Sequence, residues 1–147
     1  MKDVHIAVGS AVIALSAATG LWGAWCWWRA EPSRLFWRLL RTSQVVLLIE
    51  AALGGILELE GHRTPSLHIL YGLLPLAVSF VGEQLRISSA EAILASRGFE
   101  SAAEVGELPE EDQQSIVLSI VRREIGTMTL AAGVIVVLAL RAAMTAS

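Results

Sequence analysis

The chain has 147 residues, of which 54% are hydrophobic and only 17% charged, and its formal net charge is −3. This composition is too apolar for an ordinary soluble domain of that length, so it predicts an integral membrane protein in contact with lipid. It excludes a basic nucleic-acid binder and a disordered acidic chain, and we expect no nucleic acid among the partners. The single cysteine, Cys26, excludes an internal disulfide, a thiolate metal cluster and covalent haem attachment.

Four segments are candidates for crossing the membrane, which takes about 20 mostly apolar residues. The first, 4–28, has no charged residue and exceeds the apolar core of a cleaved signal peptide, so we expect it to remain as a span. The third also has no charged residue, and the fourth is centred on an apolar run after residue 125. The sequence therefore predicts an all-α, four-helix membrane bundle forming one domain, 1–147, with spans at about 4–28, 42–59, 64–82 and 118–141.

The stretch 83–117 is the longest predicted connection, and it is rich in acids. A short apolar piece around Phe99 can lie on the membrane surface or on the last helix, but a solvated connector is the simpler interpretation. Pro109 is followed by three acids, Glu110, Glu111 and Asp112, which is typical of a helix start. We therefore expect the fourth helix to begin near Pro109 and to project from the membrane.

The cations predict the orientation, because cytoplasmic connections carry an excess of Lys and Arg. Only Lys2, Arg63 and Arg141 lie on one side of the predicted spans. The first and third connections hold the others: Arg29, Arg34, Arg38, Arg41, Arg86, Arg97, Arg122 and Arg123. The sequence therefore predicts a cytoplasmic location for these two connections and an extracytoplasmic one for both termini. The five tryptophans, Trp22, Trp25, Trp27, Trp28 and Trp37, then gather at the cytoplasmic interface, which indole rings prefer.

Two histidines fall at matching depths near the outer end of helices that both run inward. His5 opens the first span and His68 lies about one turn into the third, within about 6 Å of the same depth. Each begins the pattern H-I-x-x-G, so Gly9 and Gly72 lie one turn deeper on the same helix faces. We expect the histidines to face each other, with the glycines removing bulk beneath them.

Small residues of the second span, Gly54 and Gly55, lie at the same height. Two neutral imidazoles on opposite helices, with a gap for a flat macrocycle, are what a six-coordinate b-type haem requires. We therefore predict non-covalent haem b with His5 and His68 as iron ligands, and Lys2, Arg63 and Arg141 available for the propionates. The alternative is that the histidines are merely polar residues tolerated at span ends.

A family resemblance points the same way. The segment Gln44-Val-Val-Leu-Leu-Ile-Glu50-Ala-Ala-Leu-Gly54-Gly55, followed by a short loop with Pro65 and by His68, resembles one four-helix half of the haem A synthases. The resemblance extends to about Leu85. It implies that His5 and His68 occupy the two ligand positions, with Gln44, Gly54 and Gly55 on the helix between them.

Other polar residues have two interpretations each. Glu50 lies within the second span, where an ionised carboxylate is costly, so it contributes to a proton or quinone path or makes a structural hydrogen bond to a Ser or Thr. Glu58 and Glu60, with His62, form a candidate zinc or copper site, but acids two residues apart do not share a helix face. Solvated loop residues are the simpler interpretation.

The leading hypothesis from the sequence is a membrane b-type cytochrome, which carries electrons to or from a quinone or a respiratory partner subunit in the bacterial cytoplasmic membrane. One alternative is a non-catalytic accessory or assembly subunit of a membrane complex. A weaker one, suggested by the resemblance, is a haem-modifying or haem-transferring enzyme, for which a homo-oligomer would supply the second half.

Overall fold

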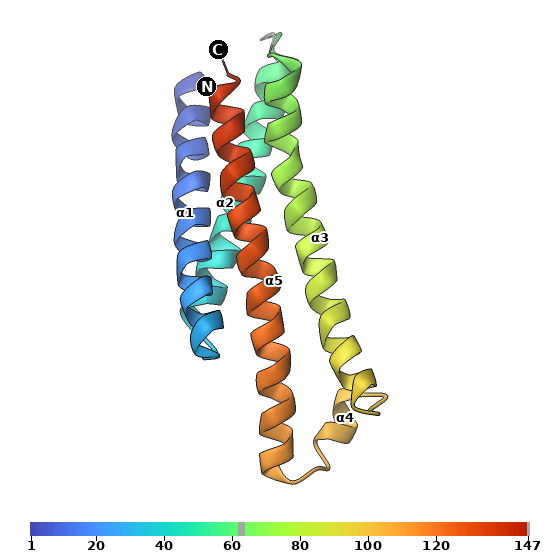
Figure 1. The fold of residues 1–147 in the computed structure, drawn as a ribbon. Helices are drawn as coiled ribbons and strands as arrows, with labels where there is room; N and C mark the ends of the chain where they lie inside the picture. The colour runs from blue at the N-terminus through green and yellow to red at the C-terminus, as the bar shows by residue number, and fades with distance from the viewer. Residues whose placement is uncertain (62–63, 147) are drawn as a thin grey trace.

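A computed structural model describes residues 1–61 and 64–146, which form helices and connecting turns and contain no strand (Figure 1). The four long helices are α1 (Lys2–Arg29), α2 (Arg34–Leu59), α3 (Ser66–Ser96) and α5 (Glu110–Met144), and α4 (Ala102–Val105) is a single turn. Each long helix is long and apolar enough to cross a membrane. The all-α prediction is therefore confirmed for the described residues, and four helices have the length and apolarity that the predicted spans require.

Local sequence explains where the helices begin and end. The Ser33 hydroxyl accepts a hydrogen bond from the Phe36 amide at 3.2 Å and so caps the start of α2. Ala30, which ends α1, adopts the left-handed conformation with φ 53°, so α1 and α2 are joined by a tight turn. Pro109 precedes the acidic first turn of α5, as the sequence predicts.

The four long helices run side by side in alternating directions, and the two termini lie at the same end (Figure 1). Helix α5 packs along both α1 and α3, and α1 packs along α2, whereas α2 and α3 touch at few positions. Figure 1 shows α5 in front of α2, with α1 and α3 on the two flanks. Helices α1 and α3 are therefore diagonal neighbours.

The interior consists of two apolar clusters separated by a polar contact. One cluster, with Phe36 and Met128 at its centre, lies toward the end away from the termini. The other contains Val12, Leu47 and Ile135. Between them the buried hydroxyls of Ser16 and Ser43 lie 3.0 Å apart, which satisfies both within the apolar interior.

The outside of the helices is apolar as well. Leu21 is 76% exposed, Phe80 66% and Val137 60%, although each lies in a helix that is long enough to span a bilayer. Large aliphatic and aromatic side chains facing outward along such helices are consistent with contact with lipid chains.

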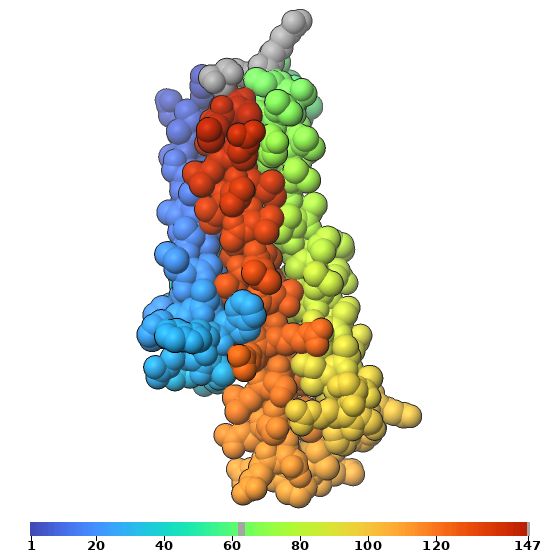
Figure 2. Space-filling view, in the orientation of Figure 1, coloured from blue at the N-terminus to red at the C-terminus, as the bar shows by residue number. Residues whose placement is uncertain are grey.

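Helices α3 and α5 continue past the ends of α1 and α2, at the end of the molecule away from the termini (Figure 2). The third predicted span ends at residue 82, but α3 runs on to Ser96, and α5 already begins at Glu110. Most of the predicted connector 83–117 is therefore helix. The guanidinium of Arg86 donates to Glu124 at 3.1 Å and that of Arg97 to the Ser119 hydroxyl at 3.4 Å, so the two extensions are tied together.

Candidate functional site

His5 and His68 meet at the end of the molecule that carries the termini. His5 lies in the first turn of α1 and His68 in the first turn of α3, and α1 and α3 are diagonal neighbours. Their ring centroids are 6.0 Å apart, and the ring planes are inclined by 73°. The helix starts thus bring together the two histidines that share the H-I-x-x-G pattern.

Each histidine also lies beside an oxygen of a further helix. The Nδ1 atom of His68 lies 2.8 Å from the backbone carbonyl oxygen of Ala142 in α5. A carbonyl oxygen only accepts hydrogen bonds, so this contact requires the proton of a neutral ring on Nδ1. The Nε2 atom of His68 then keeps a free lone pair, the state in which imidazole binds a metal.

The partner of His5 is Glu50. Its Oε1 atom lies 3.0 Å from His5 Nδ1, and the two side chains are only 19% and 18% exposed. The distance suits an ion pair or a hydrogen bond, but the angles of the contact do not suit a hydrogen bond. Accordingly, His5 Nδ1 and Glu50 Oε2 are buried polar atoms without a hydrogen-bond partner among the described residues.

The glycines around the pair have different neighbours. A Cβ atom on Gly9 would lie 2.7 Å from Glu50 Oε1, and one on Gly54 would lie 3.4 Å from His5 Cε1. These two glycines therefore make room for the His5 and Glu50 side chains. A Cβ atom on Gly55 or Gly72 would meet no atom of the described residues within 4 Å, so space is open at these two positions.

Gly9 thus has a different neighbour from the one that the sequence suggests. We expected it to leave a gap for a flat ring beneath His5, but the Glu50 carboxylate lies against it. Glu50 was expected either to bond a Ser or Thr or to serve a proton or quinone path, and its carboxylate lies beside His5. This pairing depends on how far α2 extends past α1, which the apolar runs alone do not specify. The contact between His68 and the Ala142 carbonyl was not predictable either, because a backbone carbonyl is not marked by any residue type in the sequence.

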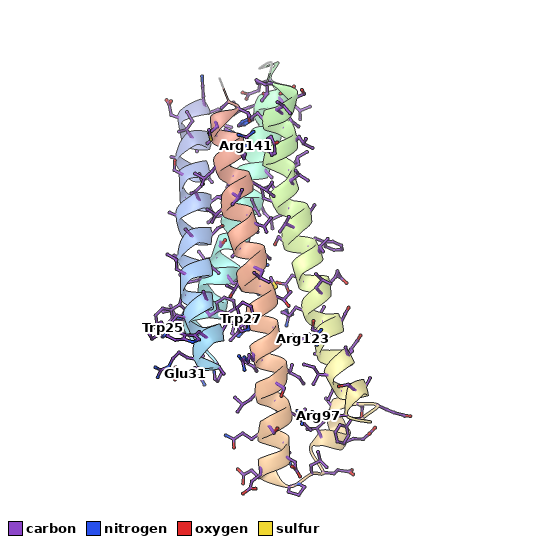
Figure 3. The ribbon with its side chains drawn as sticks, viewed as in Figure 1. Trp25, Trp27, Glu31, Arg97, Arg123 and Arg141 are labelled. Atoms are coloured by element: carbon purple, nitrogen blue, oxygen red, sulfur yellow. The ribbon has the colours of Figure 1, made fainter. Side chains whose placement is uncertain are left out.

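The remaining predicted residues lie outside this contact. Glu58, Glu60 and Lys2 are exposed, and within residues 1–61 and 64–146 no group of three His, Cys, Asp or Glu side chains is arranged to hold a metal ion. His62 and Arg63 lie outside the described residues. Arg141, labelled at the same end of α5 in Figure 3, places its guanidinium 5.6 Å from the centre of the Tyr71 ring.

A second polar cluster, which the sequence analysis missed, joins α2 to α3 farther from the termini. The Glu83 carboxylate accepts hydrogen bonds from the side chains of Arg41, Gln44 and Arg86. Gln44 also donates to the Ser79 hydroxyl at 3.2 Å, and Arg86 also binds Glu124. The positive charges of Arg41 and Arg86 are balanced by the negative charges of Glu83 and Glu124. The Glu83 cluster bridges the two helices that otherwise touch little, whereas no such bridge joins their described residues near His5 and His68.

Comparison with protein-family models, with curated proteins and with solved structures gave no match.

Proposed function

We propose that this protein is a membrane cytochrome that binds haem b through His5 and His68 and carries single electrons. The observation that supports this most is the arrangement of the two rings. They come from diagonal helices, their centroids are 6.0 Å apart, and each has an oxygen beside Nδ1. A metal about 2 Å from each of two facing imidazole nitrogens separates the ring centres by roughly 6 Å.

The donor set favours haem over a bare metal ion. A structural zinc site takes four protein ligands and a catalytic one takes three. Among the residues that the structure describes, no three His, Cys, Asp or Glu side chains are grouped in that way. Haem iron needs only two axial ligands from the protein, because the porphyrin supplies the other four.

The surroundings offer room for a flat ring on one side. Gly55 of α2 and Gly72 of α3 leave open space where side chains would otherwise stand. Helices α2 and α3 touch little, so the gap between them is the natural place for the ring to enter. Lys2 and Arg141 lie at the same end and can pair with the propionates.

The bound haem would supply reversible one-electron chemistry. The protein would orient the haem ligands and adjust the reduction potential of the iron. The Ala142 carbonyl would hold the His68 ring in one tautomer, and the Glu50 carboxylate, whose Oε1 atom lies 3.0 Å from His5 Nδ1, is close enough to do the same for His5 once a hydrogen bond forms. A carboxylate partner also makes the imidazole a stronger electron donor. Both effects stabilise ligation of an iron by two neutral rings.

The excess of cations at the end away from the termini supports a cytoplasmic location for that end. The four helices then form a bundle in the bacterial cytoplasmic membrane with the histidines near its outer face. An electron carrier at this depth serves a quinone or a partner subunit on the outer side of the membrane.

The deciding experiment is a visible spectrum of the protein purified from haem-replete cells. A narrow, low-spin Soret band with sharp bands on reduction is expected. His5→Ala and His68→Ala should each give high-spin or absent haem, while His62→Ala should leave the spectrum nearly unchanged. Colourless wild-type protein, or low-spin haem in the His5, His68 double variant, would refute the proposal. Colourless protein would favour an accessory subunit without a cofactor.

A further inference from the structure

Two neighbouring hollows lie between α1 and α5. The first has a volume of about 320 Å³ and is lined by Trp27, by Arg122 and Arg123, and by the hydroxyl residues Ser119 and Thr127. The second, of about 480 Å³, is lined almost entirely by apolar residues, among them Gly20, Gly133 and Val137. Leu130 lines both, so the two hollows adjoin, and together we call them the α1–α5 groove, with a polar end and an apolar end.

The polar end carries positive charge that the protein does not neutralise. Within the described chain, neither Arg122 nor Arg123 has a carboxylate within 4 Å, although Arg29, Arg41 and Arg86 all do. The adjacent acid, Glu124, is already paired with Arg86. Figure 3 shows Trp27 of α1 and Arg123 of α5 at neighbouring heights of the molecule. Trp27 packs over Gly126, where a Cβ atom would lie 2.8 Å from the indole.

The apolar end runs from there toward the middle of the helices. Gly133 is seven residues past Gly126 in α5, or about 10 Å deeper along the axis, and Val137 lies about 6 Å beyond it. A Cβ atom on Gly133 would meet no described atom within 4 Å, so this part of the groove is open. Thr129, between the two ends, has a buried hydroxyl without a hydrogen-bond partner in the described ranges.

We propose that this α1–α5 groove binds one anionic phospholipid, with its phosphate at Arg122 and Arg123 and one acyl chain along Gly133 and Val137. Two guanidiniums without a carboxylate partner in the described chain are suited to a phosphate group, and their positive charge favours an anionic headgroup over a zwitterionic one. Trp27 lies at the level of the headgroup region, as interfacial indoles do. The site is independent of haem binding.

The test is native mass spectrometry of the full chain released from detergent micelles. Dioleoyl-phosphatidylglycerol is compared with dioleoyl-phosphatidylcholine, which has the same chains. Wild-type protein should retain the anionic lipid preferentially, and Arg122→Gln with Arg123→Gln should weaken that retention by about thirtyfold. The matched control is Arg34→Gln with Arg38→Gln, two exposed arginines of α2 outside the groove, and it should change retention less than twofold.

A second variant tests whether the apolar end of the groove binds an acyl chain, and it leaves the charge of the protein unchanged. Gly133→Leu places a side chain in open space, so it should keep the helical content while lowering retention of the anionic lipid severalfold. Equal retention of the two lipids by wild-type protein, or an equal loss in the Arg34, Arg38 control, would overturn the proposal. So would glycerol 3-phosphate competing as strongly as the whole lipid, because the chain would then contribute nothing. If the double arginine variant fails to fold, the wild-type lipid comparison and Gly133→Leu still decide.

Discussion

Glu50 and His5 approach to 3.0 Å between Oε1 and Nδ1 across the space that Gly9 leaves open. The pair joins α2 to α1 at the end of the molecule that carries both termini. The His68 ring of α3 lies there too, next to the His5 ring. A carboxylate behind one imidazole and a carbonyl behind the other is the arrangement that orients metal-ligating histidines. If His5 binds haem as proposed, Glu50 would be a positioning residue for His5.

Glu50→Gln should keep the helices folded and weaken haem binding by about tenfold or more, because an amide is a poorer acceptor for the His5 ring. Haem titration of the apoprotein measures the affinity, and the reduction potential of the residual haem should shift as the ligand becomes less basic. Glu58→Gln, an exposed acid of the same helix, is the control and should change neither quantity. Equal effects from both variants would show that Glu50 does not act through His5.

Gly9→Ala should displace the Glu50 carboxylate, because the added Cβ atom would lie 2.7 Å from Oε1. We expect a loss of haem occupancy, with thermal stability unchanged or lower despite the gain of about 1 kcal/mol that alanine gives a helix interior. Gly133→Ala has the same helix gain and no neighbour within 4 Å, so it should be stabilising. Melting curves of the two variants measure the difference, and equal stabilisation would contradict this role of Gly9.

Gly72→Leu tests whether the open space beside Gly72 is where the porphyrin ring binds. A Cβ atom at this position meets no described atom within 4 Å, so the apoprotein should tolerate the larger side chain. The slot for the porphyrin would be filled, and haem occupancy should fall by at least half while the helical content stays constant. Pigment per mole of protein and circular dichroism measure the two effects. Full haem occupancy in this variant would exclude ring binding beside Gly72.

The Glu83 cluster should contribute to stability, because one carboxylate serves Arg41, Gln44 and Arg86. Glu83→Gln leaves the exposed Arg41 and the partly buried Arg86 without their shared anion, and we expect it to destabilise the protein by about 1–3 kcal/mol. Glu91→Gln, an exposed acid of the same helix, should change stability by less than about 0.5 kcal/mol. Thermal unfolding in detergent measures both, and equal melting temperatures would show that the cluster is replaceable by solvent.

The orientation is tested by labelling intact cells with a membrane-impermeant maleimide. Cys26 is only 3% exposed, so it contributes little background. Thr145→Cys, near the end of α5, should react, whereas Gly106→Cys, between α4 and α5, should react only after the cells are opened. The reverse pattern would place the histidine pair at the cytoplasmic face.

Much of the fold is predictable from the sequence because apolar runs of sufficient length have few alternatives to a helix in a membrane. The proximity of His5 and His68 also follows, since both lie near the starts of helices that run in the same direction. The extension of α3 to Ser96 does not follow, because apolar run length marks where lipid contact ends and not where the helix ends. The contact of Glu50 with His5 depends on the rotation and axial offset of two helices, which α2 and α1 acquire only on packing.

Both termini lie at the same end of the molecule, after an even number of long helices. Two copies joined tail to head would therefore insert with the same polarity, and their linker would stay on one side without an additional crossing. The two histidine pairs would then lie at the same depth of the bilayer, close to the linker. Duplication of this chain is a topologically simple route from one histidine pair to two pairs side by side at one end of a longer bundle.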